Sequence, residues 1–286
     1  MICFPNAKIN LGLRVLRKRA DGYHDIETVF FPIPLCDVLE LVALEQDFNG
    51  DHFLNMPDSH RLYYSYSGDT VIGDPENELT VKAVMAYARE FGVSTDLFMH
   101  LHKKIPSGAG LGGGSSDASS ALKTINTLEG EKVDKSSLLN LAASIGSDCP
   151  FFILNEPCHA EGRGELLKPT PVSLSGFYLV LVKPSFGVST AEAYSRVLPN
   201  HNSAAPSLVE VIKMPVDTWK QCLFNDFEKG VFELYPRLAE IKNTLYEAGA
   251  LYASMSGSGS TMFGLFIDEP LLNNLFHDCF VFKTNL

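Results

Sequence analysis

The sequence is poor in basic residues and contains no long hydrophobic run. Its 23 lysines and arginines stand against 34 aspartates and glutamates, which gives a formal net charge of −11. Because nucleic acids and anionic membranes bind proteins through a basic surface, this balance argues against both as partners. The longest apolar stretches, such as Phe177 to Val182, are far shorter than the ~20 residues that span a bilayer. We therefore expect no transmembrane segment, and any anionic ligand must bind in a local basic pocket.

Cysteines are few and scattered, and the first residues do not resemble a signal peptide. The six cysteines include no C-x-x-C pair, and the chain is large enough to fold without disulfides, so we expect reduced thiols. Residues 1–8 have no basic start, apolar middle or small-residue cleavage site, and we expect a cytoplasmic protein. With 45% hydrophobic and 20% charged residues, the 286-residue chain is typical of a globular protein with two packed subdomains.

Hydrophobic periodicity predicts a mixture of helices and strands. The first part of the chain, to about residue 40, alternates short apolar runs with turns, which favours strands and hairpins. Apolar residues at helical spacing predict four helices, over 79–91, from Ser115 to about Leu128, around 138–145 and from Pro236 to about Ala248. Apolar or alternating runs predict strands over 97–105, 177–183 and 262–267. Residues 199–206 lack periodicity and are expected to form a loop.

A glycine-rich segment lies between a predicted strand and a predicted helix. Glycines let backbone N–H groups approach a phosphate, and the start of the following helix adds the positive end of its dipole. This context predicts an anion-binding loop, with a flexible turn as the alternative. The residues expected to bind the anion are Pro106, Ser107, Gly108, Ala109, Gly110, Leu111, Gly112, Gly113, Gly114, Ser115 and Ser116.

Two familiar phosphate-binding motifs can be compared with this loop. The sequence contains no Gly-Lys pair, which excludes the P-loop motif. Three of the glycines, Gly108, Gly110 and Gly113, match G-x-G-x-x-G, so a dinucleotide-binding fold is a rival interpretation. That fold places an acidic residue about twenty positions later at the end of a second strand. Here the acidic residues in that region lie in a polar connection.

Three segments in order together resemble the GHMP small-molecule kinases: Pro5 to Leu11, Pro106 to Ser116, and Ser254 to Ser260. Four shorter strings resemble the members that act on a cytidine-diphosphate-linked methylerythritol: Asn6-Ala7-Lys8-Ile9-Asn10-Leu11, Asp21-Gly22-Tyr23-His24, Gly146 to Phe152, and Asn225-Asp226-Phe227-Glu228. The resemblance implies an α+β fold with two parts. These are an S5-like, ATP-binding amino-terminal half over 1–162 and a ferredoxin-like carboxy-terminal half over 163–286.

The resemblance also implies an activity. It is the ATP- and Mg²⁺-dependent phosphorylation of the 2-hydroxyl of the cytidyl-linked alcohol, in non-mevalonate isoprenoid precursor biosynthesis. A GHMP kinase for another small alcohol, such as homoserine or mevalonate, is the nearest alternative. A nucleotide sensor without turnover is a second. The Mg²⁺ ligands and the oligomeric state stay open.

Two residues match the catalytic positions of the family. By resemblance, Asp148 accepts the proton of the substrate hydroxyl, while Lys8 stabilises the developing charge and keeps Asp148 ionised. Each residue type also has a structural interpretation. Asp148 could be a helix N-cap with Pro150 in the first turn, and Lys8 could be a solvated surface lysine.

The remaining candidate residues match binding positions. By resemblance, Asn10, Tyr23 and His24 hold the cytidyl substrate, and Tyr194 stacks on cytosine; a core tyrosine is the alternative for Tyr194. Lys103 matches a nucleotide-side position, against the alternative of an exposed strand lysine. The family often has an adenine-side asparagine where this sequence has a glutamate, so the adenine contacts are left open.

Overall fold

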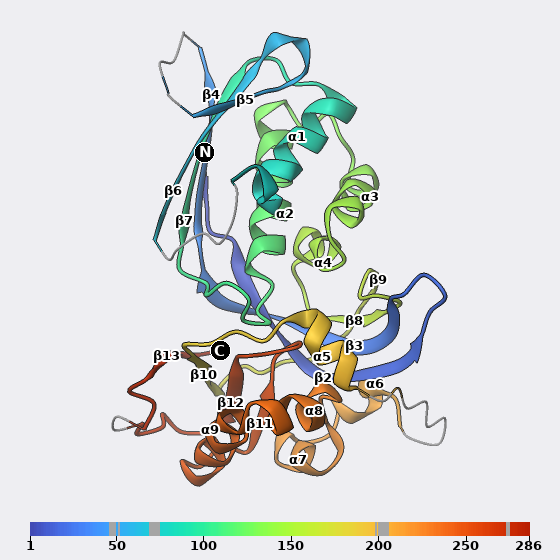
Figure 1. Cartoon of the computed structure of the whole chain (residues 1–286), viewed down its shortest axis with the longest axis vertical. Coiled ribbons are helices and arrows are strands. Elements are labelled where there is room, and N and C mark those ends of the chain that lie inside the picture. The colour runs from blue at the N-terminus through green and yellow to red at the C-terminus, as the bar shows by residue number, and fades with distance from the viewer. Residues whose placement is uncertain (46–49, 51, 69–74, 198, 200–205, 273–274) are drawn as a thin grey trace. The chain divides into compact units, whose positions relative to one another are not determined.

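The structure, a computed structural model, describes residues 1–45, 50, 52–68, 75–197, 199, 206–272 and 275–286 (Figure 1). Its contacts divide the chain into two compact units, and each unit combines separate stretches of sequence. Unit 1 consists of Met1–Ala7, Leu35–Ser107 and Gly112–Asn155; unit 2 consists of Lys8–Pro34, Gly108–Leu111 and Glu156–Leu286. The expected organisation in two parts is thus present, while the boundary between residues 162 and 163 stays a prediction.

Unit 1 is built on a five-stranded sheet in the order β1-β4-β7-β6-β5. Only β6 and β7 are parallel; the other neighbouring strands run antiparallel. The strands are β1 (Ile2–Cys3), β4 (Val38–Leu44), β5 (Phe53–Asn55), β6 (Arg61–Gly68) and β7 (Asp96–Lys103), with 3₁₀ turns at Pro57–Ser59 and Pro75–Asn77. A dinucleotide-binding fold requires a mostly parallel sheet, so that rival interpretation is wrong.

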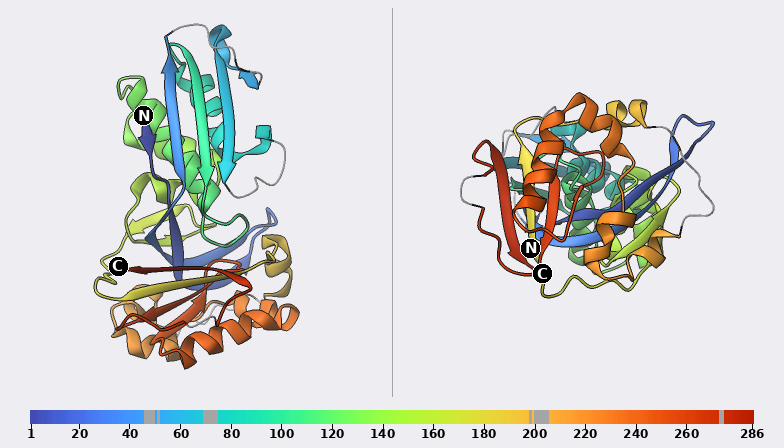
Figure 2. Two further views of the ribbon diagram at one scale, coloured as in Figure 1. Left: turned by 90° about the vertical axis from the view of Figure 1, so that its left-hand side faces the viewer. Right: turned by 90° about the horizontal axis from the view of Figure 1, so that it is seen from below.

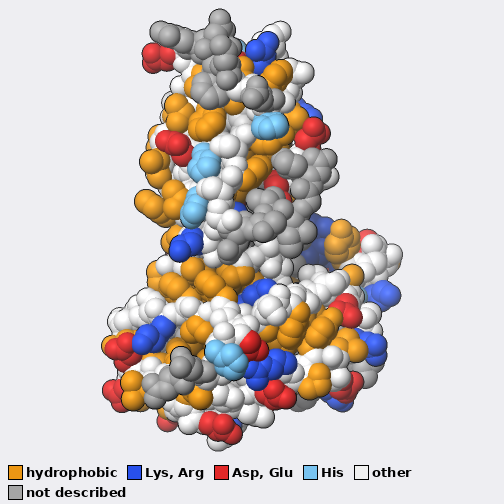
Figure 3. All heavy atoms as spheres, turned by 60° about the vertical axis from the view of Figure 1, so that its left-hand side comes forward, with side chains coloured by type: hydrophobic (Ala, Val, Ile, Leu, Met, Phe, Trp, Pro, Cys, Tyr) orange, Lys and Arg blue, Asp and Glu red, His pale blue; other side chains and the backbone are white. Residues whose placement is uncertain are grey.

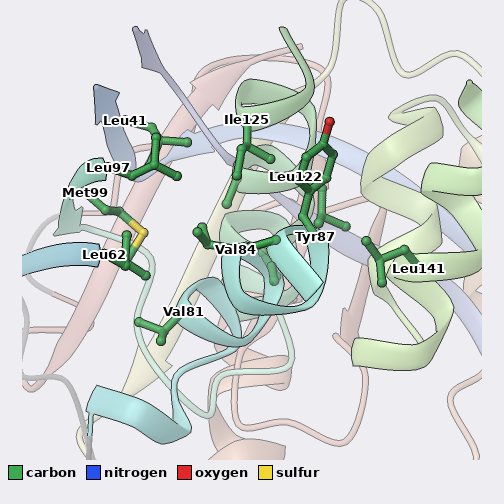
Figure 4. Packing of buried hydrophobic residues seen from close by; sticks show 14 of the residues in the cluster. Leu41, Leu62, Val81, Val84, Tyr87, Leu97, Met99, Leu122, Ile125 and Leu141 are labelled. Atoms are coloured by element: carbon green, nitrogen blue, oxygen red, sulfur yellow. The ribbon is translucent and has the colours of Figure 1, made fainter. Parts of the chain in front are cut away.

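Four helices lie on one side of this sheet: α1 (Leu79–Phe91), α2 (Gly113–Leu128), α3 (Lys135–Ile145) and α4 (Cys149–Leu154) (Figure 2). Figure 4 shows the core between them, where Val84 and Ile125 from the helices lie toward Leu97 and Met99 from the sheet. Burying each such side chain contributes roughly 1.5–3 kcal/mol. This core fixes the sheet and α2, which together frame the glycine-rich segment.

The other face of the sheet carries histidines and apolar side chains, which gather on the upper part of Figure 3. The hydroxyl of Ser67 bonds both His100 Nε2 at 2.9 Å and His102 Nδ1 at 2.8 Å, while Ser65 bonds His100 Nδ1 at 2.7 Å. The described residues contain no group of three or more His, Cys, Asp or Glu that could hold a metal ion. These histidines therefore form a polar ladder across two strands.

Unit 2 contains two four-stranded sheets, in the orders β2-β3-β8-β9 and β11-β12-β10-β13. The strands are β2 (Asn6–Lys18), β3 (His24–Cys36), β8 (Cys158–Glu161), β9 (Leu166–Pro169), β10 (Tyr178–Pro184), β11 (Tyr252–Met255), β12 (Met262–Phe266) and β13 (Cys279–Asn285). The helices are α5 (Thr190–Arg196), α6 (Leu208–Val211), α7 (Trp219–Cys222), α8 (Phe227–Leu234) and α9 (Pro236–Glu247), with a 3₁₀ turn at Val216–Thr218.

The expected mixture of helices and strands is confirmed. Helix α1 has the predicted bounds and ends where Gly92 takes a φ of +72°. Helix α2 begins two residues before the predicted start, at Gly113 rather than Ser115. The predicted loop over 199–206 falls mostly outside the described residues. No helix in the described ranges is both long and apolar enough to cross a membrane.

Candidate active site

The glycine-rich segment forms the predicted connection from a strand to a helix. It follows β7 and leads into α2, whose N-cap is Gly112 in a left-handed conformation with a φ of +72°. No side chain caps the start of α2. The N–H groups of a helix's first turn have no partner within the helix, and they carry the positive end of its dipole. This helix start is therefore suited to bind an anion such as phosphate.

The glycines of the segment have different reasons to lack a side chain. Gly108 has a φ of +60° and nothing within 4 Å of where its Cβ would lie, so the backbone there is open to a ligand. A Cβ on Gly110 would instead lie 2.0 Å from the carbonyl oxygen of Ser256. Gly110 is thus required by a contact inside the protein, while Gly108 leaves room for a phosphate.

That contact joins the first glycine-rich segment to a second one. We call residues 256–260, between β11 and β12, the second loop. Ser256 Oγ donates to the carbonyl oxygen of Gly110 at 2.8 Å, and Thr261 N donates to that of Ala109 at 3.2 Å. Two of the segments that carry the family resemblance therefore meet within unit 2.

Lys8 and Asn10 lie on β2, and both are buried. Lys8 Nζ donates to Asn10 Oδ1 at 2.7 Å and lies 4.9 Å from the centre of the Phe30 ring. Asn10 Nδ2 donates to Thr28 Oγ1 at 2.9 Å, so the Asn10 amide is fixed at its nitrogen while its oxygen accepts the bond from Lys8. Lys8 is 4% exposed, and its interpretation as a solvated surface lysine is wrong.

Asp148 lies at the N-cap position of α4, and Pro150 lies in the first turn, as its structural interpretation predicts. Its side chain, however, makes no capping hydrogen bond to α4. The start of this helix is held from α2, where Ser119 Oγ donates to the carbonyl oxygen of Cys149 at 2.7 Å. Asp148 belongs to unit 1 and Lys8 to unit 2, and their joint role stays a prediction.

Lys103 is buried at the end of β7, which contradicts its interpretation as an exposed strand lysine. Its Nζ is paired with Asp37 and, at 2.6 Å, with Asp117 Oδ2 on α2. Burial raises the pKa of Asp117 to about 8. The negative charge of Asp37 also raises this pKa, while the positive charge of Lys103 lowers it. Burial lowers the pKa of Lys103, but the two carboxylates outweigh it and the net shift is upward. No sequence pattern indicated Asp37 or Asp117 as partners of Lys103, from which they lie 66 and 14 positions away.

The predicted substrate residues include a stacked aromatic pair. The rings of His24 and Tyr194 are 4.6 Å apart and inclined by 17°, while the Phe227 ring meets Tyr194 edge-on at 4.8 Å. Partial burial, with the charge of Lys18, lowers the pKa of His24. Tyr23 is exposed, with the Arg163 guanidinium 5.1 Å from its ring centre. Tyr194 therefore contacts the buried Phe227 ring and stacks with the His24 ring.

Comparison with known proteins agrees with these features. Family models match residues 78–156 as the GHMP kinases N terminal domain and residues 208–279 as the GHMP kinases C terminal domain. A protein of Parabacteroides distasonis, named 4-diphosphocytidyl-2-C-methyl-D-erythritol kinase, is 48% identical over all of both chains. The chain belongs to the GHMP kinase family. It is therefore a small-molecule kinase of the α+β class.

Solved structures support the same fold for this GHMP kinase. A crystal structure of a 4-(cytidine 5'-diphospho)-2C-methyl-D-erythritol kinase is 32% identical, covers 93% of this chain and 90% of its own, and superposes with a TM-score of 0.74. A homoserine kinase from Cytophaga hutchinsonii is 16% identical, covers 98% and 94%, and has a TM-score of 0.67. The second likeness shows the fold alone.

Proposed function

We propose that this GHMP kinase transfers the γ-phosphoryl group of ATP to the 2-hydroxyl of 4-diphosphocytidyl-2-C-methyl-D-erythritol, in isoprenoid precursor biosynthesis. The observation that carries the proposal is the 48% identity, over the full length, to the relative of that name. The stacked pair of His24 and Tyr194 supports it, because aromatic faces suit a pyrimidine base. Homoserine and mevalonate offer no such base.

The chemistry of phosphoryl transfer rests on positioning and charge stabilisation. In our proposal, Asp148 accepts the proton of the 2-hydroxyl as that oxygen attacks the γ-phosphorus. Asp148 lies at the N-cap position of α4, within the string from Gly146 to Phe152 that carries the family resemblance. Lys8 stabilises the negative charge that develops on the phosphoryl oxygens, and its hydrogen bond to Asn10 fixes the direction of the ammonium group.

ATP binds, in this proposal, with its phosphates over the glycine-rich segment. The open backbone at Gly108 and the uncapped start of α2 offer N–H groups to phosphate oxygens. Mg²⁺ would be held through the ATP phosphates, water and one or two carboxylates, as is common in kinases, and would neutralise charge on the phosphates.

A coupled assay of ADP release against a panel of alcohols tests the function. We expect turnover with the cytidyl-linked methylerythritol and little or none with homoserine or mevalonate. ATP binding without turnover of any alcohol would favour the sensor. Asp148→Asn keeps the shape of the side chain and removes the proton acceptor, so kcat should fall by roughly 10²-fold or more with ATP affinity little changed. Near-normal turnover of this variant would remove Asp148 from the mechanism.

A further inference from the structure

The segment Asn225–Glu228 has no part in the mechanism above, yet it connects several parts of unit 2. Its backbone extends the edge of β2: Leu13 N donates to Phe224 O at 2.9 Å, and Asp226 N donates to Leu13 O at 2.8 Å. Asp226 Oδ2 also accepts a hydrogen bond from Val15 N at 2.8 Å. The segment is therefore fixed to the strand on which Lys8 and Asn10 lie.

Asn225 uses its side chain to hold the second loop. It is 3% exposed, and its amide nitrogen donates to Met255 O and to Gly257 O, both at 2.8 Å. These two carbonyl groups flank Ser256. The Ser256 hydroxyl donates to Gly110 O, and the Ser256 carbonyl oxygen leaves no space for a Cβ on Gly110. The position of Asn225 thus determines where the second loop meets the glycine-rich segment.

Glu228 holds the end of β11, the strand that leads into the second loop. Glu228 Oε1 accepts hydrogen bonds from Met255 N at 2.9 Å and from Ser254 Oγ at 3.1 Å, while its Oε2 is paired with Lys242 at 2.5 Å. The Oδ1 of Asn225 accepts a hydrogen bond from Phe227 N at 3.0 Å. The loop and the start of α8 are consequently locked together by buried polar bonds.

Phe227 is a core residue of unit 2 that contacts Tyr194. The side chain is 3% exposed, and the planes of the Phe227 and Tyr194 rings are inclined by 88°, which is an edge-to-face arrangement. Such pairs have a preferred direction, so Phe227 restricts the orientation of the Tyr194 ring that packs on His24.

We propose that Asn225 and Phe227 are positioning residues for phosphoryl transfer. Asn225 places the glycine-rich segment for ATP through the second loop, and Phe227 places the aromatic pair for the cytidyl substrate. The second half of this inference rests on the proposed function, because only that function gives Tyr194 a substrate base. The first half requires only that the chain binds ATP.

Asn225→Asp tests the first half. It keeps the size and the acceptor for Phe227 N, but it removes both N–H donors and places a carboxylate against two carbonyl oxygens. We expect the dissociation constant for ATP, measured by calorimetry, to rise about tenfold or more, with KM for the cytidyl substrate within about twofold. Asn225→Ser, which is smaller and uncharged, serves if the first variant does not fold.

Asn126→Asp is the matched control. Asn126 is a buried asparagine of α2 in unit 1 that also makes three bonds, to Val133 O at 2.9 Å, from Val133 N at 3.0 Å and from the Tyr87 hydroxyl at 3.0 Å. Both substitutions should lower the melting temperature, but only the one at Asn225 should weaken ATP binding. Unchanged ATP affinity in a folded Asn225 variant, or an equal loss in Asn126→Asp, would overturn this half.

Phe227→Leu tests the second half, with Phe263→Leu as the control because Phe263 is a fully buried ring of unit 2 whose neighbour is Tyr252 at 5.8 Å. We expect Phe227→Leu to raise KM for the cytidyl substrate about fivefold without changing ATP affinity. In a Tyr194→Ala background it should add nothing, since its effect acts through that ring. Additive effects, or an equal rise in Phe263→Leu, would overturn this half.

The two proposals fail in distinguishable ways. If the unmodified chain binds ATP but does not phosphorylate the cytidyl-linked alcohol, the proposed function fails, and the positioning role of Phe227 fails with it. The ATP titration of Asn225→Asp does not use that substrate, so it still supports or refutes the positioning role of Asn225.

Discussion

Replacing Asp117 by asparagine should change how the stability of the protein depends on pH. Asp117 is 1% exposed, and burial raises its pKa to about 8 although Lys103 is paired with it. Within the described residues, its Oδ1 has no hydrogen-bond partner, so nothing at that oxygen favours the ionised form. In the unfolded chain the carboxyl titrates near its ordinary pKa of about 4.

The sign of the effect follows from where the proton is held. Between about pH 4 and pH 8, folded Asp117 keeps a proton that the unfolded chain has lost, so stability falls as pH rises through this range. One proton changes the free energy of unfolding by about 1.4 kcal/mol per pH unit. The unmodified protein should therefore lose stability through this group between pH 5 and pH 7, on the order of 1 kcal/mol per pH unit. Asparagine has no such proton, and the variant should lack this contribution.

Urea unfolding of both proteins at pH 5, 6 and 7 measures the difference. Circular dichroism is the appropriate signal, because the single tryptophan, Trp219, lies in unit 2 and does not report on unit 1. Relative to the unmodified protein, the variant should become more stable as pH rises from 5 to 7, because groups away from the Lys103–Asp37 pair contribute equally in both proteins. A flat difference would refute a buried, protonated Asp117.

Asp134→Asn is a control of opposite sign. Asp134 caps α3, and its hydrogen bonds with the backbone and side chain of Ser137 lower its pKa. Its stabilising effect is present above its unfolded pKa and is lost as pH falls through the folded one. Asp134→Asn should therefore be less stable than the unmodified protein at neutral pH, and this difference in stability should disappear in acid.

Two further predictions concern the ligands. Gly108→Ala should weaken ATP binding about tenfold if the open backbone at Gly108 contacts phosphate, whereas Gly130→Ala, also at a positive φ with open space around it, should leave calorimetric ATP affinity unchanged. Tyr194→Ala should cost about 1–3 kcal/mol of cytidyl-substrate binding, measured as a raised KM, while Tyr194→Phe keeps both ring contacts and should be close to neutral. A marked loss of melting temperature with an unchanged KM would instead make Tyr194 a residue of the core.

The sequence predicts the long elements well because periodicity needs several turns to become visible. Helix α1 buries Val81, Val84 and Ala88 on one stripe and stops at Gly92, so both ends can be read. Helices α5 to α8 have between four and eight residues, too few for a stripe, and they were not predicted.

The motifs of the candidate site could be predicted from the sequence, but the burial of its charged and polar side chains could not. Strand β2 is buried on both faces through most of its length, so no alternation marks Lys8 and Asn10 as members of one internal pair. Their spacing of two residues places them on the same face of the strand, which permits the hydrogen bond that holds them. The charges around Lys103 come from distant positions, and no local pattern could have indicated them.

The glycine-rich segment explains why a literal motif match can suggest the wrong fold. In a dinucleotide-binding fold, the three glycines of G-x-G-x-x-G permit a tight turn, close approach of the pyrophosphate and close packing of helix on strand. Here Gly108 leaves open backbone, and Gly113 permits close packing, since its Cβ would lie 3.0 Å from Ile105 Cγ2. Gly110 differs, because it accommodates Ser256 of the second loop. The G-x-G-x-x-G string thus reflects the geometry of a tight connection from a strand to a helix. Such connections occur in both antiparallel and parallel sheets. The strand directions of the sheet, and the segments that contact the loop from elsewhere in the chain, distinguish the two folds.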